Sequence, residues 1–270
     1  DNSRQEPKIA PSPAPHAYGA SGFGRLRNAL KEPRASHIYF IVRDDDGKSD
    51  ILFQTSDPTW VAYNGYNRDN IETNTYGSSI QGVRAGRRYE LRAYKVSYNR
   101  PFSNRNRDTV NQVFNAEYPM LRWLEANGYD VSYFSGLDSS RRGEEILEHK
   151  LFLSVGHDEY WSAEQRTNVE AARDAGVNLA FFSGNEVFWK TRYEPSLDDS
   201  KTPNRTLVCY KENHSNAKID PMKDVWTGTW RTSSPYNPEG PKPENALMGV
   251  IFTVNAWRYD PIKVPADYGN

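Results

Sequence analysis

Two short segments of the sequence concentrate the side chains that could do chemistry. Gly156–Trp161 contains a histidine, an aspartate, a glutamate and a tyrosine, and Ser183–Trp189 adds an asparagine and a second glutamate. Each segment has a glycine at its start, which permits a sharp turn and brings the polar groups close together. Such a set suits proton transfer or the binding of a cation through hard oxygen ligands.

Several common catalytic sites are poorly supported by the sequence. It has no Gly-x-Ser-x-Gly elbow, no His-Glu-x-x-His motif and no glycine-rich phosphate loop after a strand. The single cysteine, Cys209, lies in the apolar run Leu207–Tyr210, which predicts a buried structural thiol. These observations argue against serine or cysteine hydrolases and against a zinc hydrolase of the common type.

The carboxylates leave three interpretations open. Glu159 together with tyrosine phenolates would suit a hard, highly charged metal such as ferric iron, although residue types alone do not choose among 17 tyrosines. Glu159 and Glu186 would alternatively form a metal-free hydrolytic pair, or Glu186 would be a carboxylate at a helix N-terminus. In the simplest interpretation, His157 and Asp158 cap a helix and the aromatic side chains fill the core.

The elements that would position these segments alternate between helix and strand from residue 115 onward. Two successive β-α-β units imply parallel strands with helices on both faces, and ligands bind at the carboxyl ends of such strands. Both chemical segments directly follow a predicted strand. The predicted elements are a helix Ala116–Asn127, a strand Tyr129–Phe134, a helix Gly143–His149, a strand Lys150–Val155, a helix from Ser162 to Asp174 and a strand Val177–Phe182.

The rest of the chain is less regular. Residues 1–35 are rich in proline and glycine and predict a flexible arm, followed by a single α/β domain over 36–270. That domain divides into a β- and loop-rich part, 36–112, and a Rossmann-like part, 113–262. The further expectations are a hairpin of strands His37–Arg43 and Asp50–Thr55 around the turn Asp44–Gly47, a long loop over 57–87, and strands at Arg88–Ser97, Thr206–Tyr210 and Leu247–Val254.

The two segments together resemble a known family. The run Gly156–Trp161, followed by Ser183-Gly184-Asn185 and Phe188-Trp189, is similar to the C-terminal domain of the N,N-dimethylformamidase large subunit and its uncharacterised bacterial relatives. Leu121–Glu125, Gly128–Asp130 and Trp226–Arg231 fit the same family, as does Gly249 in its predicted strand. The resemblance covers roughly residues 37–255.

This resemblance implies a three-layer fold with a mostly parallel sheet, like that of the class I glutamine amidotransferases but without their cysteine nucleophile, and with an N-terminal β-rich extension. It also implies an amidohydrolase that acts on a non-peptide C–N bond of a small amide. A mononuclear iron (Fe3+) would be held by two tyrosines and one glutamate, the latter at Glu159. The neighbouring catalytic residues would be His157 and Asn185.

The two tyrosine ligands are expected upstream of the Rossmann-like part. The best placements are Tyr63, in Trp60–Asn64, and Tyr98, in Ser97–Pro101. Three other tyrosines remain open alternatives: Tyr66, Tyr94 and Tyr118.

The sequence also departs from the characterised enzyme. Asp158 stands where the enzyme has proline, Ser183 stands where it has glycine, and the chain looks short at its C-terminus. An extra carboxylate beside a metal would alter the charge of the site. These departures point to a different substrate or to a loss of activity.

Composition limits the partners and leaves one alternative function. The sequence has 34 Lys and Arg residues against 35 Asp and Glu residues, so it has no excess of basic residues to bind nucleic acid. No apolar stretch reaches the roughly 20 residues that span a bilayer.

Expected partners are a small amide substrate and either a small partner subunit or a second copy of the chain. The alternative is a non-catalytic interaction module with aromatic loops at Thr59–Tyr76 and Ser233–Pro241. Secreted and cytoplasmic locations are equally compatible.

Overall fold

The computed structural model describes residues 38–64, 74–76, 81–84, 87–90, 92–102, 113–114, 116–182 and 184–253. Contacts divide the chain into Asp1–His37 and Ile38–Asn270, and all elements below belong to the second unit. The predicted arm over 1–35 lies outside the described residues. No helix among those that are described is long and apolar enough to cross a membrane.

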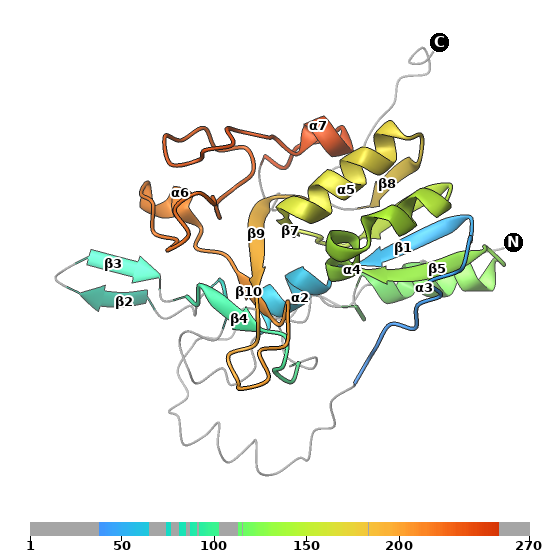
Figure 1. Cartoon of the computed structure of the whole chain (residues 1–270), viewed down its shortest axis with the longest axis horizontal. Helices are drawn as coiled ribbons and strands as arrows, with labels where there is room; N and C mark the ends of the chain where they lie inside the picture. The colour runs from blue at the N-terminus through green and yellow to red at the C-terminus, as the bar shows by residue number, and fades with distance from the viewer. Residues whose placement is uncertain are drawn as a thin grey trace, which may run out of the picture. The chain divides into compact units, whose positions relative to one another are not determined.

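A four-stranded parallel sheet forms the centre of the second unit (Figure 1). Its strand order is β5-β1-β6-β8, so the two chemical segments follow neighbouring strands. Because all four strands are parallel, their carboxyl ends lie at one edge. The bounds are β1 Ile51–Thr55, β5 Val131–Ser135, β6 Leu151–Val155 and β8 Asn178–Phe182.

Helices cover both faces of this sheet (Figure 1). Successive side chains of a strand point to opposite faces. Leu52 of β1 and Phe152 of β6 therefore pack with Val169 of α5, whereas Phe53 packs with Leu124 of α3. The helices on the first face are α4 Gly136–Arg141, the 3-10 helix η2 Gly143–Glu148 and α5 Ala163–Asp174, and α3 spans Glu117–Ala126 on the other. The expected α/β class and its three layers are thus present.

A second sheet lies beyond the carboxyl edge of the first. Its order is β4-β10-β9-β7, with β7 parallel to β9 and the other pairs antiparallel. Residues 156–159 connect β6 of the first sheet to β7 of the second, which places Glu159 at their junction. The bounds are β4 Lys95–Ser97, β7 Tyr160–Ser162, β9 Trp189–Glu194 and β10 Thr206–Val208, and a separate hairpin pairs β2 Gln81–Arg84 with β3 Arg87–Glu90.

Local signals explain where the central helices begin. Ser162 accepts a hydrogen bond from the Gln165 backbone N–H at 3.1 Å and thereby caps α5, as its sequence predicts. Ser135 and Asp138 form a reciprocal capping box at the start of α4, a helix that the sequence analysis did not predict.

The predicted N-terminal hairpin is wrong. Residues 38–43 form no strand, although the turn Asp44–Gly47 is present, with the Gly47 N–H bonded to the Asp44 carbonyl at 3.1 Å. β1 instead pairs in parallel with β5 and β6. All five residues of β1 are buried, which is typical of an interior strand of a parallel sheet covered on both faces.

Two further predictions need correction. The expected loop over 57–87 begins with helix α2, Asp57–Tyr63, whose first turn contains Pro58 and whose apolar side chains are buried. The expected strand Leu247–Val254 is instead a short helix α7, Asn245–Met248, and no strand follows it up to residue 253. Gly249 adopts φ 75° and ends α7.

Candidate functional site

The carboxylate of Glu159 is the centre of a buried cluster of oxygen atoms. The Tyr63 hydroxyl donates to Oε2 at 2.7 Å, and the Tyr76 hydroxyl donates to Oε1. The Trp189 indole N–H also donates to Oε1, at 3.1 Å. Glu159 is only 2% exposed, so both carboxylate oxygens are satisfied by side chains from three separate parts of the sequence.

Helix α2 positions the first tyrosine of this cluster. Thr59 Oγ1 accepts hydrogen bonds from the backbone N–H groups of Glu159, at 2.9 Å, and Tyr160, at 3.3 Å. Tyr63 lies one turn further along α2 and therefore reaches the Glu159 side chain from the same helix face. These hydrogen bonds fix α2 to the segment 156–159, which joins the two sheets.

The second tyrosine belongs to a segment fastened to the end of α2. The Thr75 backbone N–H donates to the Ala62 carbonyl at 3.0 Å, and the hydroxyls of Thr75 and Tyr160 share a hydrogen bond at 2.9 Å. Tyr76 consequently stacks on Tyr63, with ring centroids 4.0 Å apart and planes inclined by 21°. Tyr76 is 37% exposed and forms the open side of the cluster.

Burial governs the ionisation of both phenols. Burial raises the pKa of the Tyr63 hydroxyl well above 10, and the charge of Glu159 raises it further. Burial does the same for Tyr76, followed by the influence of Tyr160 and Glu159. Both side chains are therefore neutral donors to the carboxylate in the metal-free protein.

Tyr98, the other tyrosine expected at the site, lies elsewhere. Its hydroxyl donates to Asp57 Oδ2 at 3.0 Å, and its ring packs 6.3 Å from that of Tyr193. Burial raises the pKa of Asp57 to about 7. Within the described residues, no hydrogen bond joins Tyr98 to Glu159, although Tyr63 and Tyr98 pack against the same buried cluster.

Two of the alternative tyrosines make other aromatic contacts in the described part of the chain. Tyr94 stacks on Tyr210 at a centroid distance of 4.8 Å, and Tyr118 lies edge-on to Phe114 at 6.0 Å. Tyr66 lies outside the described residues. Tyr76 was not predicted as a ligand, because no local pattern marks it: long-range contacts of its neighbours Asn74 and Thr75 hold its segment at the site.

The two expected catalytic residues lie on the loops after β6 and β8. Nδ1 of His157 is buried and has no hydrogen-bond partner among the described residues. Asn185 is half-buried and adopts φ 59°. Neither side chain is hydrogen-bonded to Glu159 in the part of the chain that the structure describes.

The remaining carboxyls of the two segments face a different environment. Asp158 is fully buried and accepts hydrogen bonds from Gln54 and from Ser154, the latter at 2.9 Å. Glu186 is also fully buried, and neither of its oxygens has a partner among the described residues. Burial, together with the charge of Asp158, raises the pKa of Glu186 to about 10.

Cys209 matches its sequence interpretation. The thiol is fully buried in the second sheet, and burial raises its pKa to about 11. The prediction of a buried structural thiol is confirmed.

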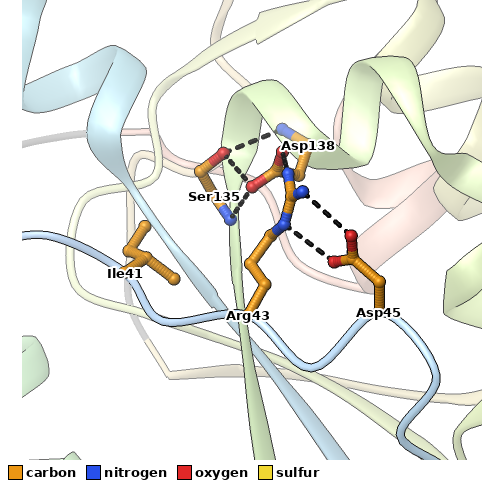
Figure 2. Close-up of a pocket in the computed structure, with 5 residues that line it drawn as sticks. All are labelled: Ile41, Arg43, Asp45, Ser135 and Asp138. Atoms are coloured by element: carbon orange, nitrogen blue, oxygen red, sulfur yellow. Dashed lines mark hydrogen bonds and ion pairs between the residues drawn. The ribbon is translucent and has the colours of Figure 1, made fainter.

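A separate hollow of about 380 Å³ lies at the carboxyl end of the edge strand β5 (Figure 2). Arg43 bridges Asp45, at 2.9 Å, and Asp138 there, and Ser135 caps α4 beside them. The ion pair between Arg43 and Asp138 attaches residues 41–45 to the start of α4. Because the charged side chains that line the hollow pair with one another, they leave no unpaired charge for a ligand.

The donor types at Glu159 restrict what the site could bind. No group of three or more His, Cys, Asp and Glu side chains among the described residues could hold a metal. The Glu159 cluster consists instead of two phenols and one carboxylate. Such oxygen donors suit a hard cation rather than zinc or copper.

Fold and site together define an α/β protein with an oxygen-rich centre at the carboxyl edge of a parallel sheet. Residues 15–269 match the family N,N-dimethylformamidase beta subunit-like, C-terminal, and the chain belongs to that family. This confirms the family expected from the two motifs and relates the chain to an amide hydrolase. No curated protein matches the chain.

Proposed function

We propose that this protein is an iron-dependent hydrolase of a small amide, with Tyr63, Tyr76 and Glu159 as the iron ligands. One observation carries the proposal: two phenol hydroxyls from separate segments converge on the two oxygens of one buried carboxylate. The ligand set has the composition that the family resemblance implies. In it, Tyr76 takes the place that the sequence analysis gave to Tyr98.

The donor set fits a ferric ion. Phenolate and carboxylate oxygens are hard, anionic ligands, and tyrosine is an established ligand of iron. The high pKa of both phenols describes the metal-free protein, because a bound cation favours the ionised form of its ligands. Two phenolates and one carboxylate would balance the three positive charges of Fe3+.

When bound there, iron would supply Lewis acidity, which polarises an amide carbonyl and makes a water molecule more acidic. The chain's own residues have separate tasks. Trp189 and Thr59 hold Glu159 in position through its carboxylate and its backbone N–H. His157, with its unpartnered Nδ1, would carry a proton toward the leaving amine, and Asn185 would orient the substrate.

The finer fold assignment belongs to the same proposal. A parallel sheet with helices on both faces supports an architecture like that of the class I glutamine amidotransferases. The buried thiol of Cys209 agrees with chemistry that does not use a cysteine nucleophile. A small partner subunit or a second copy of the chain remains part of the proposed assembly.

The alternative of a non-catalytic interaction module is not favoured. Buried polar side chains that converge on one carboxylate contribute little to a surface contact, whereas they form a ready-made ligand set. The metal-free pair of Glu159 and Glu186 is also less favoured, because no hydrogen bond among the described residues joins Glu186 to Glu159 or to any other group.

The test is the iron content and visible spectrum of two matched tyrosine variants. We expect wild-type protein reconstituted with iron to bind about one iron per chain, to show a visible tyrosinate charge-transfer band and to hydrolyse small formamides or acetamides. Tyr76→Phe should lose most of the bound iron and reduce hydrolysis at least about 100-fold, because one of three ligands is gone.

Tyr98→Phe is the control, since it removes the same hydroxyl from a tyrosine bonded to Asp57. It should keep the iron and the band. Iron retained in Tyr76→Phe but lost in Tyr98→Phe would restore Tyr98 as the ligand. Wild-type protein that takes up no iron would refute the metal site as a whole.

A further inference from the structure

Asp158 is a buried side chain that the proposed mechanism does not use. It lies between His157 and Glu159 in the segment that joins the two sheets, and it is fully buried. Its Oδ2 accepts hydrogen bonds from the Gln54 side-chain amide and from the Ser154 hydroxyl, the latter at 2.9 Å. Both donors belong to strands of the parallel sheet, β1 and β6, so these hydrogen bonds attach Asp158 to that sheet.

The amide of Gln54 has a fixed direction. Its oxygen accepts hydrogen bonds from the Ser139 hydroxyl on α4 and from the side-chain amide of Gln165 on α5, the latter at 3.2 Å. Because two donors occupy this oxygen, the NH2 group is the end directed at Asp158, and Asp158 must present an acceptor to it. One buried network thus joins two helices, strand β1 and Asp158.

The backbone of Asp158 contacts the second polar segment. Its carbonyl accepts a hydrogen bond from the Val187 N–H at 2.9 Å. Val187 adopts φ 50°, which is an outlier for a β-branched side chain. Such a conformation persists only where surrounding contacts hold it. The carbonyl of Asp158 is one of these contacts, and it thereby holds the loop between β8 and β9, which carries Asn185.

We propose that Asp158 is a positioning residue, which attaches the segment 156–159 and the loop between β8 and β9 to the parallel sheet. Through these attachments it sets where Glu159 and Asn185 lie relative to each other. The inference rests on the proposed function for its effect on iron, whereas the attachment itself concerns the metal-free protein. Because both donors need an acceptor oxygen, the position depends on the hydrogen bonds of Asp158 and not on its charge.

Two replacements of Asp158, in the full chain reconstituted with iron alone, separate its hydrogen bonds from its charge. Asparagine has nearly the same shape and keeps an acceptor oxygen for Gln54 and Ser154, whereas alanine removes that oxygen. We expect Asp158→Ala to bind iron about tenfold to a hundredfold more weakly than wild type, as is usual when a group that orients a metal ligand is lost. Asp158→Asn should keep most of the affinity, which rescue by a neutral acceptor explains.

Hydrogen exchange measures the attachment without iron. The Glu159 N–H donates to Thr59 Oγ1, and the Val187 N–H donates to the Asp158 carbonyl. In metal-free Asp158→Ala, peptides that contain these two N–H groups should exchange faster than in wild type, because both segments open more often. Asp158→Asn should exchange at the wild-type rate in both peptides. Mass spectrometry after pepsin digestion of the full chain gives the comparison.

Ser154→Ala and Ser49→Ala form a matched pair of smaller changes. Both serines are buried and donate a side-chain hydrogen bond at 2.9 Å, but Ser154 donates to Asp158 and Ser49 to the Ile51 carbonyl at the start of β1. Ser154→Ala should change affinity and exchange in the same direction as Asp158→Ala, to a smaller extent, since Gln54 still donates. Ser49→Ala should change neither. If circular dichroism shows that Asp158→Ala does not fold, this serine pair makes the comparison.

The outcomes separate this inference from the function on which it rests. Faster exchange in Asp158→Ala that Asp158→Asn reverses supports the positioning role even if wild type takes up no iron, a result that refutes the metal site alone. Wild-type affinity and exchange in Asp158→Ala would overturn the positioning role and leave the metal site standing. Equal losses in Asp158→Asn and Asp158→Ala would also overturn it, because the site would then need the charge. Equal losses in Ser49→Ala and Ser154→Ala would do the same, because the effect would then be one of general stability.

Discussion

At the scale of single residues, two tyrosine hydroxyls, those of Tyr63 and Tyr76, are hydrogen-bonded to Glu159. Tyr63 and Tyr98 both occur in segments that resemble the family, yet only Tyr63 is hydrogen-bonded to Glu159. Tyr76 completes the cluster from a segment with little local character of its own. The proposal of Tyr76 as a ligand therefore rests on its position in the fold, because any tyrosine that reaches the carboxylate provides the same oxygen.

A buried carboxyl at the start of α3 shows the same dependence on environment. Glu117 is 1% exposed, and its Oε1 accepts hydrogen bonds from the Ser56 backbone N–H and hydroxyl and from the Trp60 indole N–H at 2.8 Å. Burial raises its pKa from 4.5 to about 8, although the Ser56 and Trp60 donors lower it. Glu117 therefore joins α3 to the start of α2 as a largely protonated acid near neutral pH.

This predicts a specific pH dependence of stability. Because the folded-state pKa of Glu117 is raised, its stabilising contribution is fully present below about pH 4.5 and is lost as the pH rises to about 8. The loss approaches about 1.4 kcal/mol per pH unit inside that window. Glu117→Gln, which is neutral at every pH, should remove this slope when urea unfolding is followed across the window. A difference between wild type and variant that stays constant with pH would contradict the prediction.

At the scale of elements, the two glycine turns have different roles. Gly156, after β6, has φ 84°, and an added Cβ would lie 2.8 Å from the Cβ of Ala116. Gly184, after β8, does not have a positive φ, and an added Cβ would meet nothing within 4 Å. In that second segment the left-handed backbone belongs to Asn185 and Val187. Only the first turn needs glycine, because only there would a side chain be both strained and crowded.

The paired alanine substitutions test this difference. Gly156→Ala should destabilise the protein by about 2–4 kcal/mol, through the left-handed conformation and the contact with Ala116. It should also reduce iron binding, because Glu159 follows in the same turn. Gly184→Ala should change the free energy of unfolding by less than about 0.5 kcal/mol. Thermal or urea unfolding of both variants measures the contrast, and equal losses would refute it.

At the scale of the whole described unit, Glu159 lies where two sheets meet. In the parallel sheet, α2 directly follows β1, and residues 156–159 directly follow β6. In the second sheet, Trp189 is the first residue of β9. The backbone confirms the junction: the N–H groups of Phe188 and Trp189 both donate to the Glu159 carbonyl, at 3.0 and 2.8 Å. A ligand at Glu159 would therefore join elements that are far apart in the sequence.

Iron should consequently stabilise the folded protein as a whole. A ligand at 100 times its dissociation constant contributes about 2.7 kcal/mol, which corresponds to roughly 5–10 °C in Tm for a chain of this size. We expect scanning calorimetry to show this rise for wild type on adding iron and its reversal by a chelator. Glu159→Gln should show no rise. A rise of the same size in Glu159→Gln would place the iron elsewhere.

The sequence by itself determined the family and the parallel sheet around β6 and β8, because apolar strands, capped helices and a dense polar motif are local patterns. It did not determine the pairing of β1, the helix α2, or the position of Tyr76. Those depend on contacts between residues far apart along the chain: Ile51 with Leu151, Thr59 with Glu159, and Thr75 with Tyr160. Only the tertiary structure decides such contacts, because the burial that stabilises them exists only once the whole core has formed.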